Sequence, residues 1–225
     1  MKNHALTLRV LSALLGYPNG ELRAALPELG DALAADCGLS KSRLAELDAL
    51  MRWMAASDPY EVEARYVETF DRGRATSLHL FEHVHGDSRD RGPALVDLQQ
   101  TYERAGLLMQ GNELADHLPV VLEFASTQPP KVAREFLGEM AHILTAIFSA
   151  LLERESFYAS VIAAVLELSG QKVQAVPVAE EPAIDDAWAE PPAFDGCSTR
   201  GQASPNTPQP IHIVRKTPAS QGANV

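Results

Sequence analysis

The chain has 225 residues, 46% hydrophobic and 22% charged, which is an ordinary balance for a globular protein. Its formal net charge of −11 argues against nucleic-acid binding, because a phosphate backbone would repel it, and an anionic lipid surface would do the same. Cys37 and Cys197 are far apart and form no C-x-x-C motif, which argues against a disulfide scaffold and a cysteine zinc site. The negative net charge also favours a basic peptide as a partner.

The sequence predicts no secretory or membrane-spanning segment. Its apolar start is interrupted by Gly16 and Pro18 and has no small-residue cleavage site, so we interpret it as a first helix. The strongest apolar run, twelve residues from Ala141, is too short to cross a bilayer. We therefore expect a cytoplasmic protein without stable membrane insertion.

Through the first 170 residues, hydrophobic side chains recur every three or four positions, and the alternation typical of strands is absent. The first helix carries a stripe of Leu8, Leu11 and Leu15, and a second helix is expected within about 20–36. A third begins after Ser40, with Leu44, Leu47, Leu50 and Met54 on its inner face.

The fourth predicted helix has a clear start signal. Asp58 suits the N-cap, Pro59 the first helical position and Glu61 the third position of a capping box. Val62, Tyr66 and Phe70 then recur every four residues, so we expect them to face the core.

Five more helical stretches follow. A short helix over 77–84 ends at Gly86, and a longer one over 92–109 has Leu95, Leu98, Tyr102 and Leu108 inward. Another begins near Asp116, which can cap it, with Pro119 in its first turn. The stretch 131–156 is apolar on two faces, which is typical of a central helix, and a last helix spans about 157–168. The prediction is an all-α bundle of about eight or nine helices over residues 1–170.

Residues 171–225 form a separate, acidic and proline-rich tail. It holds 8 of the 15 prolines and only two bulky aromatic residues, Trp188 and Phe194. Little apolar surface is available to offset the entropy of ordering, so we expect most of this tail to be disordered.

Three polar clusters are candidate sites. His79, Glu82 and His83 have the H-x-x-E-H spacing of some zinc peptidases. On a helix, this spacing would place both histidines on one face as zinc ligands, with Glu82 as the general base. The alternative is that the histidines lie at the C-terminal end of the helix, where partial positive charge interacts favourably with the helix dipole.

The second cluster is the loop after Gly86. Arg89 and Arg91 there present planar donors suited to a phosphate or carboxylate. The alternative is a solvated loop in which Asp90 caps the next helix.

The third cluster is Glu113, Asp116 and His117. These residues form either a helix cap with one exposed histidine or an acid–base pair.

Two longer motifs carry a family resemblance. "SLHLFEHVHGDSRDRGPA" and, further on, "NELADHLPVVLEF" are similar in content, order and spacing to motifs of the NarJ family, the chaperones of respiratory nitrate reductase within the wider TorD-like group. The resemblance covers residues 5–170 and reaches weakly to about 197. Relatives often have an aromatic residue in place of His79, which speaks against zinc, and proline in place of Ala115, so we expect a looser turn here.

The resemblance implies a non-catalytic, cofactor-free helical protein. Such chaperones bind the N-terminal segment of the immature nitrate reductase alpha subunit, the catalytic one, during molybdenum cofactor insertion, and delay membrane docking. Cofactor delivery proteins are further expected partners. The alternatives are a chaperone for a related molybdoenzyme and a zinc-dependent hydrolase built on His79, Glu82 and His83.

We expect the client peptide to lie in an apolar groove between helices. Asp116 and His117 are expected to order the groove entrance, so that alanine at both weakens peptide binding without unfolding the bundle. Histidine side chains in general titrate near neutrality, so His83 and His85 are expected to make affinity depend on pH. The predicted peptide contacts are Tyr66, Phe70, Leu78, Glu82, His83, His85, Glu113, Asp116 and His117, with Arg89 and Arg91 as anion contacts.

Overall fold

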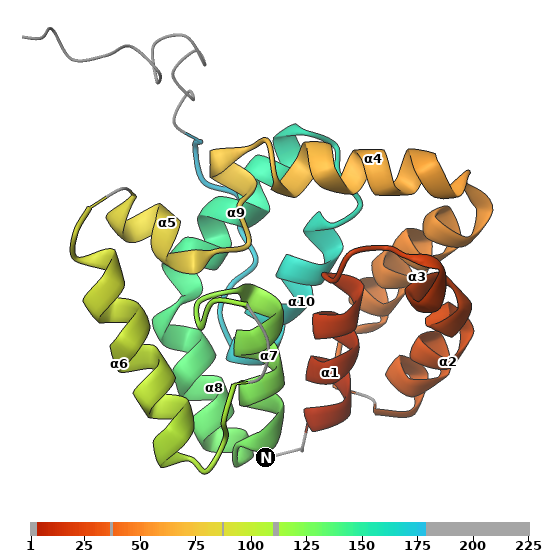
Figure 1. The fold of residues 1–225 in the computed structure, drawn as a ribbon. Helices are drawn as coiled ribbons and strands as arrows, with labels where there is room; N and C mark the ends of the chain where they lie inside the picture. The colour runs from red at the N-terminus through yellow and green to blue at the C-terminus, as the bar shows by residue number, and fades with distance from the viewer. Residues whose placement is uncertain (1–3, 37, 87, 110–112, 179–225) are drawn as a thin grey trace, which may run out of the picture. The chain divides into compact units, whose positions relative to one another are not determined.

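The computed structural model describes residues 4–36, 38–86, 88–109 and 113–178, and these residues form an all-α structure (Figure 1). They contain ten α-helices and one short 3-10 helix but no β-strand, against the eight or nine helices expected. The elements are α1 (Ala5–Leu14), α2 (Gly20–Asp36), α3 (Lys41–Ala56), α4 (Pro59–Phe70), η1 (Arg74–Thr76), α5 (Leu80–His85), α6 (Arg91–Arg104), α7 (Leu118–Thr127), α8 (Pro130–Glu139), α9 (Ala141–Glu153) and α10 (Ala159–Ser169).

The predicted starts of α3 and α4 are confirmed by their caps. The Ser40 hydroxyl accepts a hydrogen bond from the Arg43 backbone N–H at the start of α3. At α4 the Asp58 carboxylate accepts from the N–H groups of Tyr60 and Glu61, which satisfies two donors that a helix start leaves without partners. The expected inner residues of α4, Val62, Tyr66 and Phe70, are buried.

The central helix is α10, which packs against α1, α3, α8 and α9. Its sequence is almost entirely apolar, and both its faces are covered by neighbouring helices. It ends at Gly170, whose φ of 77° lies in the left-handed region that favours glycine. The sequence pattern had instead favoured 131–156 as the central helix.

The stretch 131–156 is not one helix. It divides at Met140 into α8 and α9, whose axes are bent by 66°. Gly138, a poor helix former, lies just before the break. The bend lets α8 pack against α7 and α10, while α9 packs against α10 and also reaches η1 and α5.

The structure also corrects the inward face of α6. Leu98 and Tyr102 are buried as expected, whereas Leu95 is only partly buried. The helix ends at Arg104, and Leu108 lies beyond it with its side chain 79% exposed. Gly106, with a φ of 83°, turns the chain here, so the helical period no longer applies to Leu108.

Residues 171–178 follow α10 without regular secondary structure. The Val176 N–H donates a hydrogen bond of 2.9 Å to the Ser149 hydroxyl of α9, so this first part of the predicted tail contacts the helical unit. The rest of the tail, for which disorder is predicted, lies outside the described residues.

Among the described helices, none is by itself both long and apolar enough to cross a membrane; α8 and α9 meet the requirement of length and composition only when this bent pair is taken together.

Candidate functional site

The segments before α5 and α7 are held side by side by their backbones. The Leu80 N–H donates to the Asp116 carbonyl at 3.1 Å, and the Leu118 N–H donates to the Leu78 carbonyl at 2.9 Å. These two bonds form an isolated antiparallel bridge between His79 and His117. The two imidazole rings stack with their centroids 5.0 Å apart. The bridge therefore brings together the two motifs singled out in the sequence.

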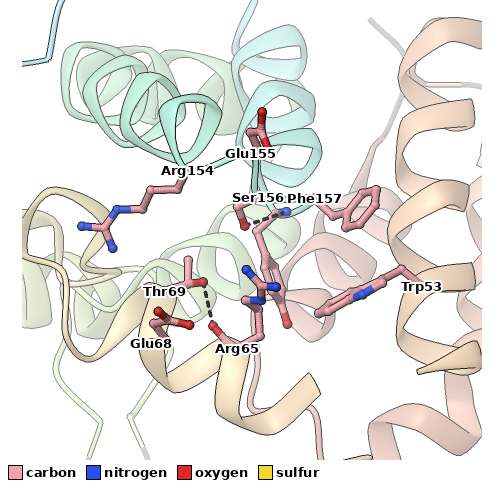
Figure 2. Close-up of a pocket in the computed structure, with 9 residues that line it drawn as sticks. Trp53, Arg65, Glu68, Thr69, Arg154, Glu155, Ser156 and Phe157 are labelled. Carbon is pink, nitrogen blue, oxygen red and sulfur yellow. Dashed lines mark hydrogen bonds between the residues drawn. The ribbon is translucent and has the colours of Figure 1, made fainter. Parts of the chain in front are cut away.

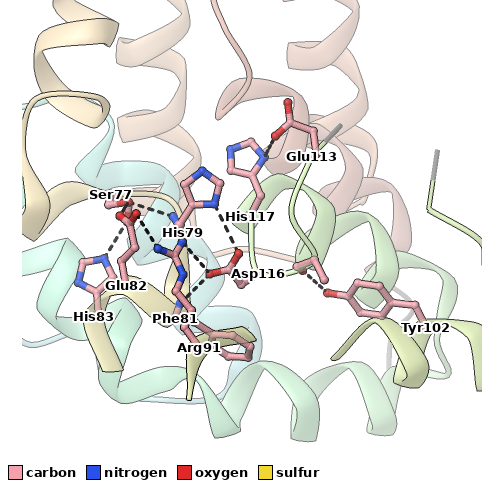
Figure 3. A network of polar contacts seen from close by, with 11 residues as sticks. Ser77, His79, Phe81, Glu82, His83, Arg91, Tyr102, Glu113, Asp116 and His117 are labelled. Carbon is pink, nitrogen blue, oxygen red and sulfur yellow. Dashed lines mark hydrogen bonds and ion pairs between the residues drawn. The ribbon is translucent and has the colours of Figure 1, made fainter. Parts of the chain in front are cut away.

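Asp116 is fully buried and caps a helix other than the one predicted. Its carboxylate accepts a hydrogen bond of 2.9 Å from the Phe81 N–H in the first turn of α5 (Figure 3). α5 has no side-chain cap of its own at His79, and α7 has none at His117. The expectation that Asp116 caps its own helix was wrong, because the bridge turns its side chain toward α5.

Arg91 joins α6 to the same cluster. Its guanidinium lies 3.1 Å from Glu82 Oε1 and 3.8 Å from Asp116 Oδ2 (Figure 3). The Ser77 hydroxyl donates to Glu82, and His83 Nε2 lies 2.9 Å from the Ser77 carbonyl oxygen. Two of the Arg91 guanidinium nitrogens thus face carboxylates of the protein itself, and its contact with a free anion stays a prediction.

Of the other polar residues near Arg91, Asp90 differs from one of the two expectations, while the anion contact of Arg89 stays a prediction. Arg89 is exposed. Asp90 occupies the N-cap position of α6 without a side-chain bond to the helix, and its own N–H donates to the Ser88 hydroxyl at 3.2 Å. The alternative expectation that Asp90 caps α6 is therefore not met through its carboxylate.

The cluster shifts the acid–base properties of three groups. The Asp116 carboxylate, 3.5 Å from His79 Nδ1, raises the pKa of His79 above its usual value despite partial burial. Burial alone would raise the pKa of Asp116, but His79, the Phe81 N–H and Arg91 together lower it. Burial lowers the pKa of His117, against the effect of Glu113. His79 and Asp116 are thus stabilised as a charged pair, whereas His117 is stabilised as a neutral ring.

The helical geometry required by the zinc hypothesis is not present. His79 precedes α5 with an extended backbone (φ −85°, ψ 101°), so it does not share a helix face with His83. His79 turns toward Asp116, while His83 contacts the Ser77 carbonyl oxygen. In the part of the chain that the structure describes, no three or more His, Cys, Asp or Glu side chains are arranged to hold a metal ion. The zinc hydrolase hypothesis therefore has no support.

The stacked histidines form part of the wall of a groove of about 790 Å³, which we call the α7 groove. Apolar side chains on its lining are Leu107, Leu108, Met109, Val120 and Phe124, joined by the aromatic Tyr17, Tyr66 and Tyr102. Three carboxylates, Asp71, Glu113 and Glu123, also lie on the lining. Each of them is exposed, so the groove combines an apolar surface with negative charge.

The predicted peptide contacts are distributed over three environments. Tyr66, Glu113 and His117 line the α7 groove. Phe70 and Leu78 are buried in the core, where a bound peptide would not touch them. Asp116 is buried behind the groove wall, and Glu82, His83 and His85 lie on α5, outside the groove lining.

The turn before α7 is better fixed than Ala115 suggested. The Tyr102 hydroxyl donates a hydrogen bond of 2.8 Å to the Ala115 carbonyl oxygen, and both residues are buried. His117 Nδ1 lies 3.2 Å from Glu113 Oε2. This contact joins the predicted acid–base partners, and it holds the His117 ring at the groove wall.

Sequence patterns did not identify most of the apolar groove residues. Leu107, Leu108 and Met109 follow Gly106, the residue at which α6 has already ended. The only sequence feature that could have indicated these groove residues is that they form an apolar run directly after a glycine that ends a helix. Tyr17, Val120 and Phe124 gave no such signal, because their positions also fit an ordinary core.

Comparison with known proteins places the chain in a family. Residues 19–159 match the family described as the nitrate reductase delta subunit. The chain is 42% identical over 188 residues to the nitrate reductase molybdenum cofactor assembly chaperone NarJ of Escherichia coli, covering 84% of this chain and 80% of that protein. It is 34% identical over 164 residues to a Bacillus subtilis protein named as a NarJ chaperone of the same kind, covering 72% and 86%.

Among solved structures, the fold is similar to that of an Archaeoglobus fulgidus protein described as a redox enzyme maturation protein. The TM-score is 0.53 at 18% sequence identity, and the match covers 76% of this chain and 96% of that one. This likeness concerns the fold. The family match and the identity to its relatives show that the chain belongs to the NarJ family of nitrate reductase molybdenum cofactor assembly chaperones, which are not enzymes.

Proposed function

We propose that the α7 groove binds the N-terminal segment of an immature nitrate reductase alpha subunit as a helix. The observation that carries this proposal is the groove itself, with apolar side chains from α7 and the α6–α7 connection and with carboxylates on the same lining. An amphipathic helix inserts its apolar face into such a groove. Basic residues on the helix would face Asp71, Glu113 and Glu123, which favours fast association.

The proposed role in the cell follows from family membership and groove chemistry together. By holding the client segment, the chaperone would keep the alpha subunit from docking at the membrane until the molybdenum cofactor is inserted. We place this step in the cytoplasm, as part of nitrate metabolism, with cofactor delivery proteins as further partners. The chaperone would release its client afterwards and would not form part of the finished enzyme.

Leu108 offers a direct test of the groove. Its exposed side chain lies on the lining, so Leu108→Asp should weaken binding of a fluorescently labelled client peptide by about 10-fold or more, since a charge would be buried against an apolar helix face. Val96→Asp is the matched control, because Val96 is 52% exposed on α6 and is not part of the groove lining. Fluorescence anisotropy gives the affinity, and native mass spectrometry gives the expected one-to-one stoichiometry.

Two outcomes of this test would contradict the proposal. A scrambled peptide of the same composition that binds equally well would show that recognition is not specific. Equal affinity of the wild type and the folded Leu108→Asp variant would place the peptide elsewhere. The same titration with the N-terminal peptide of a related molybdoenzyme distinguishes the two client classes, and the tighter binder identifies the client.

A further inference from the structure

The α7 groove has two different ends, because α1 and α7 pack side by side in opposite directions. The Ser12 hydroxyl, near the end of α1, donates a hydrogen bond of 2.9 Å to the Pro119 carbonyl, near the start of α7. Arg9, about one turn earlier on α1, donates at 3.3 Å to the Ser126 hydroxyl, near the end of α7. The lining of the groove extends from the end of α1 to the end of α7, so its two ends have different surroundings.

Two aromatic rings form the end of the groove next to α1, which we call the Tyr17 end. Tyr17 follows α1 and Tyr66 lies on α4, and their rings meet edge to face with centroids 5.6 Å apart. The Tyr66 hydroxyl donates at 2.8 Å to the Leu15 carbonyl, which fixes α4 against the end of α1. Tyr66 is buried, whereas Tyr17 is 47% exposed, so part of the Tyr17 ring is available to a bound molecule.

Three carboxylates lie near these rings. Asp71 and Glu113 are on the groove lining. Burial raises the pKa of the Tyr66 hydroxyl, and the carboxylates of Asp71 and Glu113 raise it further, so both charges act at this ring. The third carboxylate is that of Glu63, which accepts a hydrogen bond of 3.0 Å from the Tyr17 hydroxyl. An aromatic face together with carboxylates is an arrangement that stabilises an ammonium group.

The two histidines of the groove wall do not offset this negative charge. His79 is paired with the Asp116 carboxylate 3.5 Å away, and this pair has no net charge. Burial lowers the pKa of His117, which favours its neutral ring. Toward the end of α7 the lining includes the carboxylate of Glu123, and Arg9 adds a positive charge beside the same turn. Negative charge is therefore concentrated at the Tyr17 end of the groove.

Another exposed aromatic pair has different surroundings. The Trp53 and Phe157 rings stack with their centroids 5.6 Å apart, and Phe157 is 47% exposed. The pocket that they line contains two guanidinium groups, those of Arg65 and Arg154, which balance its two carboxylates (Figure 2). An ammonium group is therefore less favoured there than at the Tyr17 end. This pair serves as a control surface.

We propose that the client helix binds in the α7 groove with its N-terminus at the Tyr17 end, where its free α-ammonium group lies against the Tyr17 ring and faces the carboxylates of Asp71 and Glu113. This inference rests on the proposed function, because a direction requires that the client bind in the groove. The helix dipole favours the same direction, since the N-terminal end of a helix carries partial positive charge. The chaperone then recognises a free N-terminus as well as an apolar helix face.

The first test compares two forms of the N-terminal peptide of the alpha subunit, one with a free amine and one N-acetylated. Acetylation removes the ammonium charge and should weaken binding to the full-length chaperone about 10-fold in fluorescence anisotropy. The sign of the effect is informative, because acetylation also stabilises an isolated helix by removing a positive charge from its positive end. Equal or tighter binding of the acetylated peptide would overturn the inference.

Substitutions at the Tyr17 end locate the ammonium group. Tyr17→Leu and Asp71→Asn should each reduce the difference between the two peptides to about 3-fold, whereas Tyr17→Phe keeps the ring and should keep most of the difference. Phe157→Leu is the matched control and should leave the full difference. Circular dichroism checks that each variant is folded. An unchanged difference in folded Asp71→Asn and Tyr17→Leu would place the ammonium group elsewhere.

Photo-crosslinking separates this inference from the proposed function. A benzoylphenylalanine at the second position of the peptide should crosslink to residues around Tyr17. The same group about three turns later, a separation similar to the length of α7, should crosslink to residues around Thr127. Mass spectrometry identifies the crosslinked residues. Reversed or equal labelling of the two ends would overturn the direction and leave the groove assignment intact, whereas crosslinks outside the groove would contradict the proposed function as well.

Discussion

The Asp116 carboxylate accepts a hydrogen bond from the Phe81 backbone N–H, 35 residues earlier in the chain, at 2.9 Å. One buried acid thus caps α5 while its own backbone pairs with the segment before that helix. Arg91 from α6 and His79 provide the positive charge that burial of the carboxylate requires. The wall of the α7 groove is therefore held by interactions between the two motifs, and this arrangement determines how substitutions there should behave.

Asp116→Ala should destabilise the fold, contrary to the expectation from sequence that it would affect only peptide binding. The change leaves the Phe81 N–H and the charges of Arg91 and His79 without their partner, which should cost roughly 3 kcal/mol and lower the melting temperature by roughly 10 °C. Asp116→Asn keeps a hydrogen-bond acceptor, so its melting temperature in thermal denaturation should lie between those of the wild type and Asp116→Ala. Glu113→Ala is the control, and an equal loss of stability there would contradict this account.

Alanine substitution should affect stability differently at Arg91 and at Arg89, although the two residues are close in sequence. Arg91→Ala removes the donor that faces Glu82 and Asp116, so we expect a loss of roughly 2 kcal/mol in the free energy of unfolding. Arg89→Ala changes an exposed side chain and should stay within about 0.5 kcal/mol of wild type. Urea denaturation measures both, and similar values for the two variants would show that the Arg91 contacts are not stabilising.

His79 should make stability fall as pH rises above neutrality. Its folded pKa is raised by Asp116, so the stabilisation is complete below the unfolded value of about 6.5 and is lost as pH rises through the folded pKa. The difference in melting temperature between wild type and His79→Gln should therefore be larger near about pH 6 than near about pH 8. His142→Gln, at an exposed position of α9, is the control and should show no such trend.

His117 should act in the opposite direction. Burial lowers its pKa in the folded state, so its neutral form is favoured and stability is lost as pH falls below about 6.5 through the folded pKa. His117→Gln should reduce the loss of melting temperature on acidification from about pH 7 to about pH 5.5. An unchanged acid profile would indicate that His117 is not buried in solution as it is here.

The groove carboxylates should control association more than dissociation. Glu123→Gln should lower the association rate of a basic client peptide and reduce its dependence on salt, since charges at a rim steer encounter. Glu28→Gln is a matched control, because Glu28 is an exposed carboxylate on α2 outside the groove. Surface plasmon resonance at two salt concentrations gives the rates. A change confined to the dissociation rate would show that Glu123 contacts the bound peptide directly.

Local patterns were sufficient for much of the fold. The cap at Asp58, the stop at Gly86 and the apolar periodicity of α1, α3 and α4 depend on residues close in sequence, and all of them are found as predicted. The division of α8 from α9 was missed. Both halves are helical in local propensity, and the bend at Met140 depends on which neighbours each half packs against.

The sequence by itself determined the helical class, the excess of negative charge and, through two long motifs, the family. It also drew attention to Tyr66, Glu113 and His117, which line the groove. Only the tertiary structure decided that Asp116 caps α5, that Arg91 is held between two carboxylates, and that Phe70 and Leu78 belong to the core. The physical reason is that these properties depend on the backbone bridge between His79 and His117, a contact across 38 positions that no helical period encodes.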